Sequence, residues 1–231
     1  MKIKQKNTID MTHGTLWNKL LIFALPLAAS SILQQLFNSV DTAVVGRFAS
    51  SRALAAVGSN SSLIALMINL FIGISLGSNV IISRYIGQKA EEHVKGAIHT
   101  AIVVALCSGI FVLVLGQFIA RPVLTLMGTP KDVLDLAVLY LRIYFLGMPF
   151  IMLYDFSSSI LRSIGDSRRP LYALIAAGII NTGLNLILVI VFHLGVSGVA
   201  IATVVSNIVS SGILFYILLH EQEPIRFSLS G

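Results

Sequence analysis

Hydrophobic residues run along most of this chain in six long segments, with a short polar stretch between each segment and the next. The segments are Leu16 to Phe48, Leu54 to Ile82, Ala97 to Ile119, Val133 to Ile160, Leu171 to Phe192, and Val196 to Leu219. A helix needs about 20 mostly apolar residues to cross the hydrocarbon core of a bilayer. Each segment is long enough, and the short connections require neighbouring helices to run in opposite directions. The pattern predicts an all-α integral membrane protein, a bundle of six transmembrane helices.

The first segment carries polar residues on one face. At 100° per residue, Gln34, Asn38 and Asp41 fall within a narrow wedge of a helix. A carboxylate at membrane depth is costly unless it faces protein or water, so it marks a functional site by default. We therefore expect this stripe to line a cavity, with Asp41 as the group that takes up a cation.

Two later segments repeat this arrangement. Asn181 and Asn185 are one turn apart in the fifth segment, and Thr203, Asn207 and Ser210 share one face of the sixth. Hydrogen bonds between helices could explain any one of these stripes. Three stripes and a carboxylate together indicate an internal hydrophilic cavity.

The fourth segment contains a second acidic residue, Asp155, seven positions before Arg162. Two interpretations are open for it. Asp155 is either a second carboxylate of the cavity or a structural partner of the arginine at the end of the segment. In the same segment, Tyr140 and Tyr144 flank Arg142, a grouping typical of an anchor at the membrane interface.

Helix-breaking and small residues interrupt several segments. Pro26 and Pro149 each remove a hydrogen bond and favour a kink. A kink at Pro26 has two open interpretations, a hinge that moves or a fixed bend. Gly73 and Gly77 form a GxxxG pattern, which predicts the close approach of another helix.

The composition agrees with a membrane protein. Of the 231 residues, 56% are hydrophobic and 11% are charged, and the mean hydropathy is +0.89. Soluble domains carry about 25% charged residues. The single cysteine, Cys107, excludes a disulfide framework. The first apolar run is too long for a signal peptide, so we interpret it as a retained helix.

The net charge of +6 is distributed unevenly along the chain. Most of the 16 lysines and arginines lie before the first segment, between the second and third, and between the fourth and fifth. The positive-inside rule then places both termini in the cytoplasm and the helices in the cell membrane. This charge is loop charge, and no nucleic acid partner is expected. We divide the chain into a cytoplasmic segment 1–15, a bundle 16–219 and the start of a linker at 220–231.

Several chemistries have no motif in this sequence. It has no GxxxxGK[ST], HExxH or GxSxG pattern and no Cys/His cluster with the spacing of metal ligands. An enzyme is therefore not expected, nor is an organic cofactor. Transport against a gradient would have to draw its energy from an ion gradient, of H⁺ or Na⁺.

Four stretches together resemble a known family. They are VDTAVVGRFASSRALAAVGS, ISRYIGQKAEEHVKGAIHTA, SSSILRSIGDSRRPLYA and INTGLNLILVIVFHLGVSGVAIATVVS. In this order and spacing they are similar to MATE (multidrug and toxic compound extrusion) transporters, over essentially the whole chain. The resemblance implies a secondary transporter that expels organic cations and drugs in exchange for H⁺ or Na⁺. It also implies twelve helices in two lobes, of which this chain resembles the N-terminal lobe and lacks the C-terminal six-helix half.

The resemblance also implies a cation site. Some members use an acidic residue of the first helix, an Asn and an Asp of the fifth, and a Thr of the sixth. These positions correspond to Asp41, Asn181, Asn185 and Thr203, so Asn185 replaces a carboxylate. One carboxylate binds Na⁺ less strongly than two, whereas it is enough to carry a proton, which favours H⁺. Asp155, where relatives often have Asn, could restore the missing charge and Na⁺ coupling.

Two alternatives remain open. A lipid-linked oligosaccharide flippase of the same superfamily would share the helix pattern, although such proteins place cationic residues in the cavity. A membrane scaffold subunit without transport activity could bury the polar stripes against a partner.

Overall fold

The computed structural model describes residues 16–221 and 226–227, and the helices occupy nearly all of this part of the chain. They are α1 (Leu16–Phe48), α2 (Ser51–Gly87), α3 (Glu91–Leu126), α4 (Lys131–Leu146), α5 (Met148–Ser163), α6 (Arg168–Leu186), a π-helical turn η1 (Ile187–Val191), and α7 (Gly195–Leu219). No strand occurs among these residues. The predicted all-α membrane fold is confirmed. The predicted segment 1–15 lies outside the described residues, as does most of the linker 220–231.

The number of membrane spans depends on how the pair α4 and α5 is counted. Five helices are individually long and apolar enough to cross a membrane, and α4 and α5 make a sixth span if they are taken together. The two meet at a bend of 48° beside Gly147. Pro149 lies in the first turn of α5, where its missing N–H costs no helical hydrogen bond. A bend is therefore found beside Pro149, but as a break between two helices and not as a lost hydrogen bond inside one.

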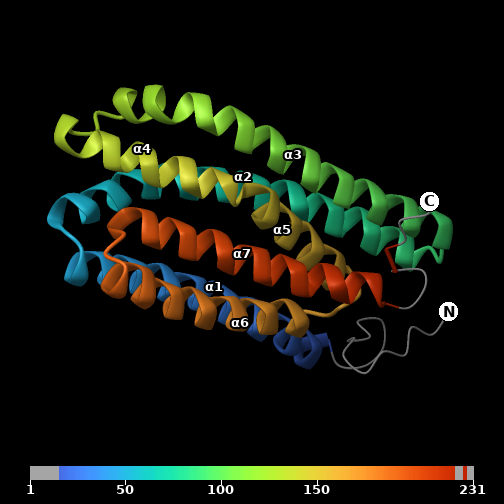
Figure 1. Ribbon diagram of the computed structural model, residues 1–231. Coiled ribbons are helices and arrows are strands. Elements are labelled where there is room, and N and C mark those ends of the chain that lie inside the picture. The colour runs from blue at the N-terminus through green and yellow to red at the C-terminus, as the bar shows by residue number, and fades with distance from the viewer. Residues whose placement is uncertain (1–15, 222–225, 228–231) are drawn as a thin grey trace.

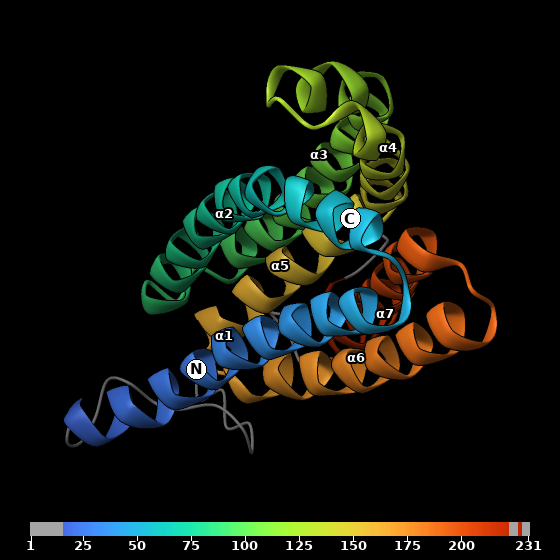
Figure 2. The same cartoon turned by 90° about the vertical axis from the view of Figure 1, so that its left-hand side faces the viewer.

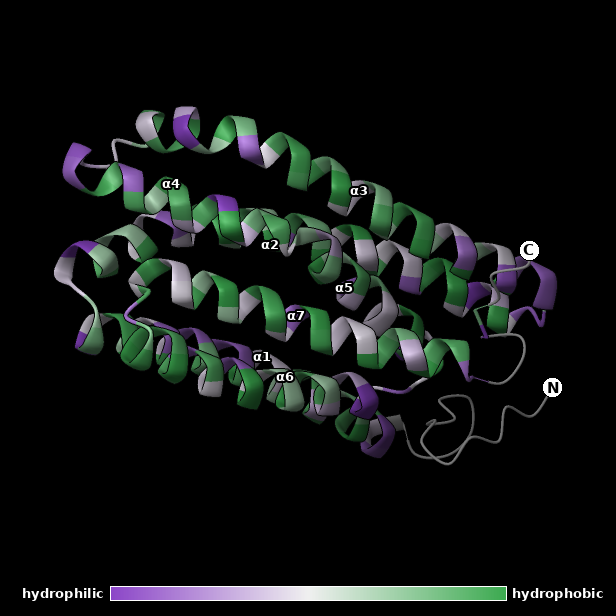
Figure 3. Cartoon of the chain, in the orientation of Figure 1, coloured by the Kyte–Doolittle hydropathy of each residue, from purple (hydrophilic) through white to green (hydrophobic). Residues whose placement is uncertain are grey.

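The helices form two groups (Figures 1 and 2). In one, α1 and α7 both pack against α6; in the other, α2 and α3 pack against each other and against α4 and α5. Helix α7 joins the groups because it also contacts α4 and α5. The largest fully buried side chains include Phe145, Met152 and Phe156, so the core is centred on the bent pair. Apolar residues continue along the lengths of the helices, and hydrophilic residues gather towards both ends of the bundle (Figure 3).

Close helix contact occurs at glycines other than the predicted pair. A Cβ atom on Gly109 of α3 would lie 2.5 Å from the Cα atom of Pro149, so the α3 backbone rests directly on the bend. Gly116 likewise accommodates the ring of Phe145. No described atom lies within 4 Å of the Cβ position at Gly73 or Gly77. The close approach predicted for the GxxxG pattern is therefore not made by any described helix.

Helix α1 lies at the edge of the bundle. Only 6% of its most apolar stretch is buried, against 33% for α7. Pro26 lies inside this helix, which continues from Leu16 to Phe48, and the Ser30 hydroxyl donates a hydrogen bond to the Pro26 carbonyl at 2.8 Å. The hinge role of Pro26 stays a prediction.

A polar cluster surrounds the start of α6 at one end of the bundle. The buried Asp166 accepts hydrogen bonds from the backbone N–H groups of Arg168 and Arg169, at 3.0 and 3.1 Å, and so caps the start of α6. The Arg169 side chain forms ion pairs with Asp166 and with Glu221, just beyond α7. The Ser167 hydroxyl donates to the Phe23 carbonyl of α1 at 3.1 Å. The Ser167–Phe23 hydrogen bond thus joins α1 to the start of α6, and the Arg169–Glu221 ion pair joins the start of α6 to the segment just beyond α7.

Candidate functional site

Three of the predicted site residues meet between α1 and α6. The amide nitrogen of Asn185 donates a short hydrogen bond to the Asp41 carboxylate. The same nitrogen donates to the Asn181 side-chain oxygen at 3.2 Å. Asn181 and Asn185 are buried, and Asp41 is half-buried. We call Asp41, Asn181 and Asn185 the carboxylate–amide cluster.

Local sequence explains why the cluster forms there. Asn181 and Asn185 are four residues apart on α6, so their side chains lie one above the other on one helix face. At Gly178, one turn earlier, the missing side chain leaves room for the ring tip of Phe37 from α1. The π-helical turn η1 begins two residues after Asn185, and such turns are frequent at functional sites.

The other polar residues predicted for the cavity are not joined to this cluster by any hydrogen bond within the described chain. Gln34 and Asn38 are exposed on α1. Thr203 is half-buried on α7, and its hydroxyl donates to the Val199 carbonyl of its own helix at 3.0 Å. Asn207 is also half-buried on α7. The cation-binding role of Thr203 and the cavity roles of Gln34, Asn38 and Asn207 stay predictions.

Asp155 lies in a different place. It belongs to α5, which makes no helix contact with α1. Its carboxylate interacts electrostatically with Arg162, two turns further along α5. Its Oδ2 atom and the Nε atom of Arg162 are buried with no hydrogen-bond partner among the described residues. The described residues show no hydrogen bond or ion pair between the two side chains, so both interpretations of Asp155, as a cavity carboxylate for cation coupling and as a structural partner of Arg162, stay predictions.

Two aromatic residues of α4 face the interior of the bundle. Tyr140 and Tyr144 of α4 are buried, and their rings lie 6.2 Å apart. Arg142, between them in the sequence, is exposed. The role of Arg142 as an anchor at the membrane interface stays a prediction, and the two buried tyrosines are not exposed beside it. Their spacing of four residues, which places them on one helix face away from Arg142, is the signal that could have indicated this.

The chemistry of the cluster suits a small hard cation or a proton. Carboxylate and amide oxygens are the ligands that hard cations prefer. The Oδ1 atom of Asn185 is buried and has no hydrogen-bond partner among the described residues. It is an acceptor next to the Asp41 carboxylate and the Asn181 oxygen. In the described part of the chain, no group of three or more His, Cys, Asp or Glu residues could hold a metal ion.

Comparisons with known proteins give a consistent result. The chain is 35% identical over 224 residues to the probable multidrug resistance protein YoeA of Bacillus subtilis, which covers 95% of this chain and 48% of that protein. It is 30% identical to the probable multidrug resistance protein YpnP of the same organism, covering 93% of this chain and 48% of that one. The chain thus spans about half the length of these curated relatives.

A solved structure confirms the fold. A transporter of the MOP superfamily from Pyrococcus furiosus superimposes with a TM-score of 0.90 at 24% identity, over 99% of this chain and 50% of that one. The family model MatE matches residues 26–187, which include Asp41, Asn181 and Asn185. The chain is therefore a multi-pass membrane protein that belongs to the MatE family.

Proposed function

We propose that this chain is the six-helix half of a multidrug efflux transporter, in which cation binding at Asp41 drives drug export. Several relatives bear the names of multidrug resistance or multidrug export proteins, which supports export of small organic cations and drugs. The chain spans about half the length of its relatives, which supports a second six-helix half as its partner. The charge distribution supports the cell membrane as location, with both termini in the cytoplasm. The relatives are named as transporters and not as enzymes, which fits the absence of catalytic motifs.

The observation that carries this proposal is the hydrogen bond from Asn185 to Asp41, because it joins α6 to a helix at the edge of the bundle. A proton on Asp41 turns an acceptor into a donor, and Na⁺ would compete with the amide nitrogen for the carboxylate. A protonated Asp41 keeps one acceptor oxygen for the Asn185 N–H and gains an O–H donor, for which the unpartnered Oδ1 atom of Asn185 becomes an acceptor when the amide rotates. The contact between α1 and α6 then differs between the cation-bound and cation-free states.

Such a difference is what a coupled transporter needs. A ligand shifts a conformational equilibrium only by the difference between its affinities for the two states. Here the cation changes a bond between α1 and α6, and Pro26 lies in the part of α1 that could bend in response. We propose H⁺ as the coupling ion, because the cluster holds one carboxylate and hard-cation affinity rises with ligand charge.

The decisive experiment replaces Asp41 in the intact transporter. Asp41→Asn keeps the shape and removes the titratable group, so drug efflux driven by a pH gradient in proteoliposomes should fall to the level of empty vesicles. Asp135→Asn is the control, because Asp135 is exposed and pairs with Arg121 at the surface. Efflux by Asp41→Asn with an unchanged pH dependence would refute the proposal.

The choice of ion has its own test. Asn185→Asp places a second carboxylate beside Asp41, and should make efflux depend on a Na⁺ gradient. The measurement is drug efflux in proteoliposomes with a Na⁺ gradient alone or a pH gradient alone. If the unchanged protein already responds to Na⁺ and not to pH, then Na⁺ is the coupling ion, and Thr203 becomes a candidate fourth ligand.

The alternatives make different predictions. A flippase for anionic lipid-linked sugars would need cationic residues, whereas the only charge in the carboxylate–amide cluster is Asp41. A scaffold subunit would bind its partner but show no efflux with any gradient. Crosslinking of this half with and without a co-expressed second half, followed by efflux assays, separates scaffold from transporter.

A further inference from the structure

The chain turns back after α7 and packs against the end of the bundle. Phe227 is 6% exposed and belongs to the hydrophobic core. Its backbone N–H donates to the Leu218 carbonyl at 3.0 Å, and this carbonyl is one of the last four of α7, which have no partner within the helix. The contact lies at the end of the bundle where α7 finishes and α3 begins (Figure 1). Phe227 is therefore fixed to the bundle.

The ring of Phe227 lies between α3 and α7. It stacks on the His99 ring of α3, with 5.5 Å between the ring centroids and 17° between the ring planes. It also lies against the Phe215 ring of α7, at 5.5 Å and 52°. Both separations are within the range of about 4.5–7 Å that aromatic pairs prefer. Helices α3 and α7 make no direct helix contact within the described chain, so Phe227 bridges two helices that otherwise do not meet.

This bridge connects the two groups of helices in the bundle. Helix α3 belongs to the group with α2, α4 and α5, whereas α7 packs with α1 and α6. The segment after α7 has a second anchor, because Glu221 forms an ion pair with Arg169 at the start of α6. Through Glu221 and Phe227, the segment contacts α3, α6 and α7 at the same end of the bundle.

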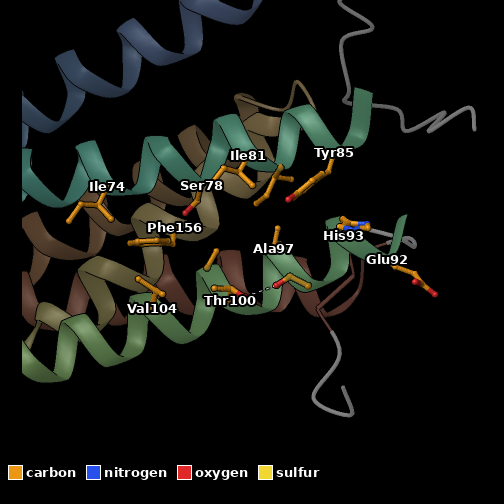
Figure 4. Close-up of a pocket in the computed structure, with 13 residues that line it drawn as sticks. Ile74, Ser78, Ile81, Tyr85, Glu92, His93, Ala97, Thr100, Val104 and Phe156 are labelled. Carbon is orange, nitrogen blue, oxygen red and sulfur yellow. Dashed lines mark hydrogen bonds between the residues drawn. The ribbon is translucent and has the colours of Figure 1, made fainter. Parts of the chain in front are cut away.

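On the side of α2, the start of α3 borders a groove of about 560 Å³ (Figure 4). Ala97 and Thr100 of α3 line this groove opposite Ile81 and Tyr85 of α2. A helix beside a groove can shift with a smaller loss of packing than a helix in a filled core. His99 does not line the groove, so the contact with Phe227 lies outside it.

We propose that the segment after α7 is a strap that closes this end of the bundle. When Phe227 is docked between His99 and Phe215, α3 is held beside α7 and the two groups of helices are joined. When Phe227 is released, the start of α3 can move away from α7. A movement of the segment therefore changes the contacts of both helices together. The strap does not involve Asp41 and does not rest on the proposed efflux function.

Hydrogen–deuterium exchange of the intact protein in nanodiscs tests the strap. Phe227→Ala removes the bridging ring, so backbone amides at the start of α3 (91–102) and the end of α7 (213–219) should exchange about tenfold faster or more. Phe118→Ala is the matched control, because Phe118 lies on α3 and is 75% exposed. It should leave the exchange of both regions unchanged. If Phe227→Ala does not fold, Phe227→Leu keeps the bulk, removes the stacked ring and should increase exchange in the same two regions.

Distances between spin labels show whether the two helices separate. The labels are attached at Glu92→Cys on α3 and Gly212→Cys on α7, two exposed positions, after Cys107→Ala has removed the native thiol. With the strap intact, we expect one narrow distribution of distances. Adding Phe227→Ala should broaden this distribution towards longer distances.

The stacked ring and the ion pair have separate readouts. His99→Ala removes the ring on α3 and should cause the same faster exchange in α3 and α7 as Phe227→Ala. His99→Phe keeps a flat ring and should retain the exchange of the unchanged protein. Glu221→Gln removes the ion pair and should increase exchange mainly at the start of α6, because Phe227 stays docked.

Three results would overturn the proposal. One is faster exchange in Phe227→Ala that is confined to α7, which would show that Phe227 only caps that helix. Another is an unchanged distance between the spin labels, which would show that α5 holds α3 in place without the strap. The last is equally fast exchange in His99→Phe and His99→Ala, which would show that ring stacking does not carry the contact.

Discussion

Asp41 lies on α1 at the edge of the bundle, whereas Asp155 lies on α5 at its centre, and the two carboxylates have different partners. Asp41 accepts a hydrogen bond from the neutral amide of Asn185. Asp155 interacts with the positive charge of Arg162 on its own helix. The neutral amide of Asn185 does not cancel the negative charge of Asp41. The carboxylate can therefore still attract a cation. Asp155 has only an opposite charge on its own helix, and neither its Oδ2 atom nor the Nε atom of Arg162 has a hydrogen-bond partner among the described residues.

The glycine contacts show the same contrast between the two regions. At Gly109 the neighbour is the Pro149 backbone, which cannot move without shifting the α4–α5 bend. At Gly178 the neighbour is the far end of the Phe37 ring, which is half-buried and can rotate. Gly109 is therefore packed against backbone, and Gly178 against a side chain that can move. A region that changes contacts during transport is expected to be of the second kind.

The largest effect on stability is expected from Arg162. Arg162→Ala leaves Asp155 without its charge partner and should destabilise the protein by up to about 3 kcal/mol. Thermal unfolding in detergent measures this loss. The double variant Asp155→Asn with Arg162→Gln removes both charges and should recover most of the stability. If the double variant is as unstable as Arg162→Ala, the two residues do not act as a pair.

Gly109→Ala should have the next largest effect. The new methyl group would press on Pro149 and should cost about 1–3 kcal/mol, the usual range for overpacking. Gly73→Ala is the matched control, because the Cβ position there is open, and alanine improves helix propensity by about 1 kcal/mol. Equal melting temperatures for the two variants would show that α3 does not rest on the bend.

A smaller effect is expected on the α1–α6 side. Gly178→Ala displaces the Phe37 ring and should cost about 1 kcal/mol or less, because the ring can move. The measurement is the melting temperature relative to Gly109→Ala. A loss as large as that of Gly109→Ala would mean that α1 is held as rigidly as the centre, which would contradict the contrast drawn above.

The smallest effect is expected from Thr203. Its hydroxyl already donates to Val199 on the same helix, so Thr203→Val should change stability by about 0.5 kcal/mol or less. Efflux driven by a pH gradient should also be nearly unchanged. A strong loss of efflux in a stable Thr203→Val protein would show that Thr203 joins the cluster when a cation binds.

Much of the fold could be predicted from hydrophobic pattern alone. The six apolar segments, the bend at Pro149 and the absence of strands follow from segment length and proline chemistry, which are properties of the chain near each residue. The i, i+4 spacing of Asn181 and Asn185 also predicted that they share a face of one helix. Such features need no knowledge of which helices are neighbours.

Other features depended on how the helices pack. Periodicity shows that Gln34, Asn38 and Asp41 share a face, but the structure shows that only Asp41 reaches α6, while the other two are exposed. Likewise, Gly73 and Gly77 match a packing motif, yet the close contact occurs at Gly109.

By itself, the sequence determined that this protein is a helical membrane bundle with a carboxylate and amides at membrane depth. Only the tertiary structure decided which of these groups meet, because a helix face has no partner until another helix packs on it. It joined Asp41 to Asn185 across α1 and α6, separated Asp155 beside Arg162, and turned Tyr140 and Tyr144 inward. The different surroundings of the two aspartates are therefore a property of the neighbouring helices and not of the residue type.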